Sequence, residues 1–273
     1  MGAVVLCAGA VLAMAGCETP VKHAERLARL GGLHALVLSG DRFQHRAYAA
    51  DRGKGGLLVL FVEGDGTPWM HQGTRVAVDP TPRAPLALKL AVETPDSVLY
   101  LGRPCYYGIQ PHPLCASEYW TSKRYSTEVV ASMATAATAY ADAHGFGKVL
   151  LVGYSGGGTL VILMARRMPL AVGVITIAAN LDPETWAALH GYLPLTGSLN
   201  PSVEPSLPGT VAEWHLVGDR DTNVPQTAAA RYLARVPPAR IWRYATFDHI
   251  CCWEQEWPAV LRRVRAELAN TDP

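Results

Sequence analysis

The chain has 273 residues and a nearly balanced charge, with 24 Lys and Arg against 23 Asp and Glu. Nucleic-acid binding needs a concentrated positive surface, and because the sequence has no basic run we expect no nucleic-acid partner. Apolar residues make up 49% of the chain, which is enough to bury a sizeable core and argues against intrinsic disorder.

The N-terminus carries an apolar run over Ala3–Ala15. This run is too short to span a bilayer but has the length of a signal-peptide core. It ends in Leu-Ala-Met-Ala-Gly directly before Cys17, a pattern that resembles the lipobox of bacterial lipoproteins. The resemblance implies a signal peptide over residues 1–16 and acylation of Cys17. We therefore expect a lipid-anchored protein of the bacterial cell envelope that faces the periplasm, with the outer membrane as its location. The alternative is an ordinary buried first helix.

Export would place the remaining cysteines in a compartment that permits disulfides. Four cysteines lie beyond Cys17: Cys105, Cys115, Cys251 and Cys252. We predict that Cys105 pairs with Cys115, because this bond closes a short, proline-containing loop. A bond between the neighbours Cys251 and Cys252 is uncommon, so these two are either reduced or one of them pairs elsewhere.

Apolar runs of strand length alternate with helical patterns along the rest of the chain. The strand-like runs lie at 33–39, 43–49, 57–62, 98–101, 149–152, 172–177, 214–217 and 241–244. The helical patterns lie at 21–30, 85–92, 126–144, 159–168, 226–235 and 257–270. This alternation predicts an α/β fold in which about eight strands form a mostly parallel twisted sheet with helices on both faces. We expect one domain over residues 17–273.

Two long stretches, 103–125 and 181–209, do not fit the alternation. Loops of this length are usually functional, so we expect them to form a lid or a pocket wall above the strand ends. Arg103 lies just past a strand end, where it could bind a carboxylate or phosphate. Anchoring of a loop is the interpretation that we favour for this arginine.

The segment Gly153–Gly157 reads Gly-Tyr-Ser-Gly-Gly and lies directly between a predicted strand and a predicted helix. This is the context that the G-x-S-x-G nucleophile motif requires, because the serine sits on a turn so sharp that its neighbours must lack side chains. The motif identifies Ser155 as a candidate nucleophile. The alternative is a glycine-rich turn that only packs tightly.

The base and the acid follow from the chain order Ser, Asp or Glu, His. His249 is the only histidine after Asp221 and is the predicted base. The acid is Asp219 or Asp221, and the run Gly-x-x-Asp-x-x-Val-Pro, which resembles the acid loop of many α/β-hydrolases, places it at Asp221. The oxyanion of an acyl-transfer intermediate needs at least two N–H donors. Gly156 is one candidate, and Gly64 or Asp65 is the other.

These motifs resemble the α/β-hydrolase superfamily over nearly all of the chain after Cys17. The chain also resembles a group of predicted hydrolase lipoproteins of Gram-negative bacteria, through Glu63–Gly66, Leu101–Cys105 and the pair Cys252-Trp253. The resemblance implies a serine hydrolase that cleaves a carboxylic ester, or a thioester or amide, through an acyl-enzyme, without a cofactor or a metal. Many lipases carry His-Gly where this chain has Glu63-Gly64, so their substrates do not carry over.

Two other functions are compatible with the same residues. An acyltransferase would use the same triad with an acceptor other than water. A binding lipoprotein would keep the fold without turnover. We expect a monomer that acts on a small-molecule or lipid-like ester and contacts the membrane through its N-terminal anchor.

Overall fold

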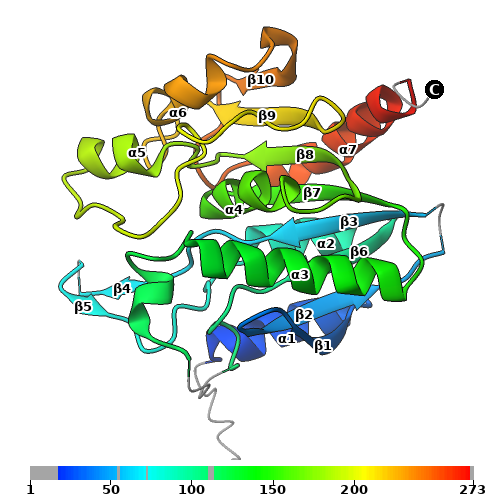
Figure 1. Cartoon of the computed structure of the whole chain (residues 1–273), viewed down its shortest axis with the longest axis horizontal. Coiled ribbons are helices and arrows are strands. Elements are labelled where there is room, and N and C mark those ends of the chain that lie inside the picture. The colour runs from blue at the N-terminus through cyan, green and yellow to red at the C-terminus, as the bar shows by residue number, and fades with distance from the viewer. Residues whose placement is uncertain (1–17, 54–55, 72, 110–113, 271–273) are drawn as a thin grey trace, which may run out of the picture.

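The computed structural model describes residues 18–53, 56–71, 73–109 and 114–270, and its centre is an eight-stranded sheet (Figure 1). The strands lie in the order β1 (His34–Ser39), β2 (Gln44–Ala50), β6 (Ser97–Leu101), β3 (Leu57–Val62), β7 (Lys148–Tyr154), β8 (Ala171–Ile177), β9 (Ala212–Gly218) and β10 (Ile241–Tyr244). Strand β2 pairs antiparallel with both of its neighbours, and all other pairs in this sheet are parallel.

Helices cover both faces of the sheet (Figure 1). One face packs against α3 (Thr127–Ala143), α4 (Gly156–Ala165) and α6 (Gln226–Leu233), and the other against α1 (Pro20–Leu30), α2 (Leu86–Glu93) and α7 (Trp253–Ala269). Strand β3 shows the two-residue period that separates the two cores. Leu58, Leu60 and Val62 enter the core that contains α3 and α4, whereas Val59 and Phe61 enter the other core.

The structure confirms the predicted fold class, and it adds elements that the sequence patterns did not indicate. The strands β4 (Trp69–Met70) and β5 (Arg75–Val76) form a separate hairpin after β3. A short 3₁₀ turn, η1 (Ser117–Trp120), and helix α5 (Pro183–Leu189) lie within the two stretches expected to be loops, and a further 3₁₀ turn, η2 (Pro238–Arg240), precedes β10. Propensity patterns over so few residues are too weak to predict such elements.

The N-terminal predictions fall outside the part of the chain that the structure describes, which begins at Glu18. The signal peptide over residues 1–16 and the acylation of Cys17 therefore remain predictions. Among the described helices, none combines the length and the apolar character that are needed to cross a membrane.

Among the cysteines that the structure describes, two disulfides form. Cys105 and Cys115 are bonded, with their Cα atoms 5.6 Å apart. Cys251 and Cys252 are bonded to each other, so the prediction that they are reduced or that one pairs elsewhere is wrong. They lie in a turn that Asp248 closes by accepting hydrogen bonds from the backbone N–H groups of the second and third residues after it.

We predict that the two disulfides differ in their contribution to stability. The bond between Cys105 and Cys115 joins residues 10 positions apart, so replacing both by alanine should lower the free energy of unfolding by about 3 kcal/mol through the freer unfolded chain. Alanine at both Cys251 and Cys252, which close no loop, is the matched control. Urea unfolding measures both variants, and an equal loss in the two would contradict the loop-closure argument.

Candidate active site

Ser155 lies between β7 and α4 on a turn whose geometry depends on glycine. Its φ angle is +52°, in the left-handed region that non-glycine residues rarely adopt. A Cβ atom at Gly157 would overlap the carbonyl oxygen of Val62, and one at Gly158 would overlap the side chain of Ala179. The glycines therefore allow α4 to begin at Gly156, three residues before the predicted start at 159, with the serine at its N-terminus.

Asp221 lies in the loop after β9 and is held from two sides. Its Oδ1 atom accepts hydrogen bonds from the N–H groups of Asn223 at 2.9 Å and Val224 at 2.7 Å. Its Oδ2 atom lies 2.8 Å from Nδ1 of His249. Backbone donors thus leave one oxygen directed at the imidazole, and the carboxylate is buried.

The other acid candidate, Asp219, makes a different contact. Its Oδ1 atom forms an ion pair with Nη2 of Arg243 at 2.8 Å, and the side chain of this arginine is about half exposed. Asp219 therefore belongs to a surface ion pair, and the structure joins Asp221, not Asp219, to the histidine.

His249 lies in the loop after β10 and connects Asp221 with Ser155. Its Nε2 atom is 3.1 Å from Oγ of Ser155. Its carbonyl oxygen accepts hydrogen bonds from the Tyr154 hydroxyl at 3.0 Å and from the Trp253 indole at 3.2 Å, so both its backbone and its ring are fixed. If Nδ1 carries the proton and donates it to Asp221, Nε2 can accept the proton of the serine hydroxyl.

Gly64 and Asp65, the two alternative donors in the loop after β3, differ in what their N–H groups do. The N–H group of Gly64 donates to Oε1 of the preceding Glu63 at 3.1 Å. Within the described ranges, the N–H groups of Asp65 and Gly156 make no hydrogen bond to another protein group. A Cβ atom at Gly64 would lie 3.3 Å from Cβ of Ser155, and one at Gly156 would overlap the Asp65 carboxylate. The free donors nearest to the serine are therefore those of Asp65 and Gly156.

The Asp65 carboxylate is held by a buried cluster that we call the arginine clamp, formed by Arg103, Arg124 and Tyr125. Nη2 of Arg103 and Nη1 of Arg124 each lie 2.8 Å from one of its oxygens. The Tyr125 hydroxyl donates to it at 2.8 Å, and the Tyr106 hydroxyl donates to the Asp65 carbonyl at 2.9 Å. Burial alone would raise the pKa of Asp65, but Arg124 and Arg103 outweigh it and lower this pKa to about 2.

The clamp gives Arg103 a role close to the favoured prediction, that of an anchor. Its side chain is only 2% exposed, so it lies under the loop after β3 and not on a surface open to ligands. Arg124 and Tyr125 were not among the predicted site residues. They lie about 60 positions from Asp65 in the sequence, and no local pattern indicates such a contact.

Glu63, the first residue after β3, is a buried acid that does not contact the cations of the clamp directly. Its Oε1 atom accepts from Gly64, and its Oε2 atom accepts at 3.0 Å from the N–H group of Ala87, in the first turn of α2. Burial raises the pKa of Glu63 to about 7 despite these hydrogen bonds. Across the described part of the chain, no three His, Cys, Asp or Glu side chains gather in a way that could hold a metal ion.

Solved structures of known proteins share this fold. An esterase from Pyrococcus furiosus is 13% identical, with a TM-score of 0.57, and the alignment covers 87% of this chain and 90% of the esterase. The mouse alpha/beta hydrolase domain-containing protein 10 is 14% identical, with a TM-score of 0.58 and coverage of 87% and 99%. A Xanthomonas campestris α/β serine hydrolase without a lid is 11% identical, with a TM-score of 0.52 and coverage of 85% and 94%.

At these identities the likeness establishes the fold, and the chain has the α/β-hydrolase fold that its motifs predicted. No protein-family model and no curated protein matches the sequence.

The raised pKa of Glu63 predicts a pH-dependent loss of stability. A carboxyl group whose pKa rises from 4.5 to about 7 on folding stabilises the folded state fully below pH 4.5, and this contribution is lost as the pH rises towards 7. The free energy of unfolding of the wild type relative to Glu63→Gln should therefore fall by up to about 3 kcal/mol over this range. Urea unfolding at several pH values measures the difference, and parallel curves for the two proteins would contradict the prediction.

Proposed function

We propose that this protein is a serine hydrolase that cleaves a carboxylic ester through an acyl-enzyme. The observation that carries the proposal is the continuous hydrogen-bonded series from buried Asp221 through His249 to Ser155, with distances of 2.8 Å and 3.1 Å. Two of the structural neighbours, named as an esterase and a serine hydrolase, are consistent with this reaction. Fold alone does not determine activity, so the site geometry is the stronger support.

In the proposed reaction His249 removes the proton of the Ser155 hydroxyl as Oγ attacks the ester carbonyl. Asp221 holds the imidazole in the required tautomer and stabilises its positive charge. His249 then gives the proton to the departing alcohol. In the second half of the reaction a water molecule, deprotonated by the same histidine, attacks the acyl-enzyme and regenerates Ser155.

The oxyanion formed in each half would be bound by the N–H groups of Asp65 and Gly156. Gly156 begins α4, so the helix dipole adds to its donor. We assign the second donor to Asp65 because the N–H group of Gly64 already donates to Glu63. The arginine clamp would act as a positioning device: two ion pairs and a tyrosine hydrogen bond fix the Asp65 side chain, and with it the direction of the adjacent N–H group.

An activated serine should react with a fluorophosphonate probe at Ser155, located by mass spectrometry of the purified full chain. Ser155→Ala should abolish labelling at this position, and His249→Ala should slow it by at least about 10³-fold because the base is lost. The exposed residues Ser206 and His34 provide the matched controls Ser206→Ala and His34→Ala. Labelling of wild type at another residue, or unchanged labelling of His249→Ala in a folded sample, would refute the triad.

The arginine clamp predicts a specific kinetic defect. Asp65→Asn keeps the shape of the side chain but leaves Arg103 and Arg124 facing a neutral amide, so the N–H direction should loosen. We expect kcat for a p-nitrophenyl ester to fall by roughly 10- to 100-fold with a smaller change in KM, since losing an oxyanion donor outright typically costs more. The surface variant Asp219→Asn is the control.

The rate is divided by the number of sites that the fluorophosphonate titrates, which removes the effect of misfolded protein. A normal kcat per titrated site in Asp65→Asn would show that the clamp serves stability alone. Arg103→Lys should retain more activity than Arg103→Met, because lysine keeps the charge.

A further inference from the structure

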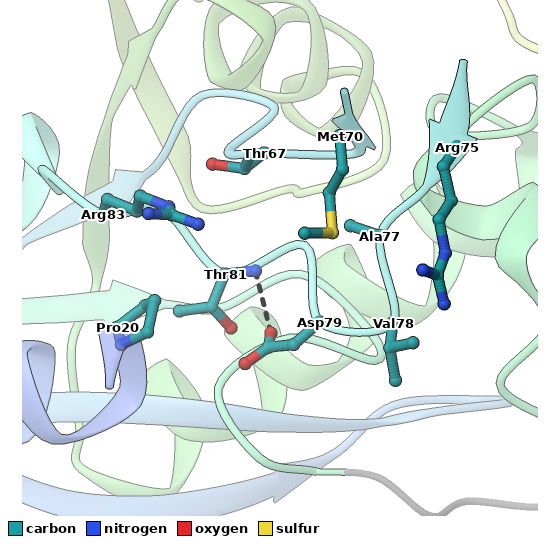
Figure 2. A pocket seen from close by; sticks show the side chains of 9 residues that line it. All are labelled: Pro20, Thr67, Met70, Arg75, Ala77, Val78, Asp79, Thr81 and Arg83. Carbon is teal, nitrogen blue, oxygen red and sulfur yellow. Dashed lines mark hydrogen bonds between the residues drawn. The ribbon is translucent and has the colours of Figure 1, made fainter. Parts of the chain in front are cut away.

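A pocket of about 380 Å³ lies between the start of α1 and the segment Thr67–Arg83 that contains the β4–β5 hairpin (Figure 2). The triad residues do not line it. Its walls combine apolar and charged side chains, with Met70, Ala77 and Val78 beside Arg75 and Arg83. The segment returns on itself, because the N–H group of Thr67 donates to the carbonyl of Pro80 at 2.9 Å.

Large apolar side chains of this segment are exposed. Trp69 and Met70 are each 37% exposed and Val78 is 74% exposed. Gathered apolar side chains on a protein surface commonly mark a site of interaction with a partner or a membrane.

The exposed charges beside these side chains are mainly positive. Arg75 and Arg83 are exposed, and in the described part of the chain neither takes part in an ion pair or a side-chain hydrogen bond. The acidic residue that lines the pocket, Asp79, has one carboxylate oxygen bound to the N–H group of Thr81. Two free arginines beside apolar side chains form the combination that binds the interface of an anionic membrane.

We propose that the exposed side chains on both sides of the β4–β5 hairpin and in the segment after it, which we together call the hairpin face (Trp69, Met70, Arg75, Val78 and Arg83), dock on a bilayer that contains anionic phospholipid. Trp69 lies on the side of the hairpin opposite Met70 and Arg75, so the hairpin would enter the interfacial region end-on. The apolar side chains would enter the interfacial region, where tryptophan is favoured, and the arginines would bind lipid phosphates. Two observations favour a lipid surface as the binding partner. The exposed apolar residues lie beside unpaired cations, and the N-terminal segment joins the fold next to the same pocket.

Pro20, the first residue of α1, lines the same pocket. Cys17 precedes it by three residues, which even in a fully extended chain span only about 10 Å. An acyl chain on Cys17 would thus enter the bilayer next to the hairpin face. This step rests on the proposed lipid anchor, whereas the exposed side chains and free arginines are independent of it.

The hairpin face is also continuous with the loop after β3 that contains Asp65, which we call the oxyanion loop. Only Gly66 separates the segment from Asp65, and a Cβ atom at Gly66 would overlap the carbonyl oxygen of Pro80. In Figure 1, β4 and β5 lie at the edge towards which the parallel strands point, the edge that carries the triad. Docking would therefore bring the oxyanion loop to the bilayer, which deepens the proposed function by naming membrane lipid esters as the substrate class.

The test uses the full chain as Ser155→Ala, so that no lipid is cleaved, with vesicles of brominated phosphatidylcholine and phosphatidylglycerol. Bromine on the acyl chains quenches tryptophans that enter the membrane. Of the seven tryptophans, five are buried and Trp186 is partly exposed, so Trp69 is the most exposed of them. Quenching should persist in Trp186→Phe and be lost in Trp69→Phe.

Further variants test the two components of the face. Val78→Ser should reduce the quenching at least about twofold, because apolar insertion contributes to binding, while Val37→Ser, which alters a 45% exposed valine on β1, should not. Replacing Arg75 or Arg83 by glutamine should weaken the salt-sensitive part of the association by about fivefold each.

Four outcomes would overturn the proposal. Protein that sediments with the vesicles but shows no quenching of Trp69 would be anchored without docking the hairpin face. Protein that does not bind, or that is quenched equally by vesicles of phosphatidylcholine alone, would rule out the anionic bilayer. Self-association lost in Val78→Ser would assign the face to a second copy of the chain. The vesicle assay needs no catalysis. A failure of membrane docking is therefore distinguished from a failure of the proposed hydrolase function, which fluorophosphonate labelling at Ser155 tests.

Discussion

The functional part of this molecule depends on one close backbone approach, between the turn after β7 and the end of β3. Gly157 lies directly against the carbonyl oxygen of Val62, where no Cβ atom would fit. Because Val62 leads into the loop that contains Asp65, this contact also sets the distance between Ser155 and the N–H groups beside it. The same glycine contact therefore determines both how α4 packs on the sheet and how the site is arranged.

Three carboxylates in the loops after β3 and β9 have little exposure to solvent, and they are stabilised in different ways. Asp221 accepts two backbone N–H groups and contacts His249. Asp65 pairs with Arg103 and Arg124, which keep its pKa at about 2. Glu63 receives N–H donors without a direct cation, and its pKa rises to about 7. Burying a charge is costly unless it is paired. The two arginines therefore keep Asp65 ionised, whereas Glu63 exchanges its proton near neutral pH.

The carboxyl edge of the sheet brings together loops that are far apart in the chain. In an open parallel sheet this edge is where side chains from successive loops meet. The loops after β7, β9 and β10 contribute the serine, the aspartate and the histidine, and the loop after β3 contributes the proposed N–H donor and then continues into the β4–β5 hairpin. The hairpin can thus define a separate surface without altering the strands beneath it.

The sequence alone determined the sheet and the identity of the three side chains that the structure joins. Buried parallel strands read as continuous apolar runs, and a serine between glycines after such a run can occupy only a sharp turn. The order of the chain left His249 as the sole histidine after Asp221. Tertiary structure decided what depends on contacts between distant residues. It joins Asp221, not Asp219, to the histidine, and it leaves the N–H group of Asp65, not that of Gly64, without a protein acceptor. The clamp of Arg103 and Arg124 and the exposed hairpin depend on such contacts in the same way. A hydrogen bond across about 60 residues and the fraction of a side chain that remains exposed arise only when the segments pack, and for that reason no local pattern encodes them.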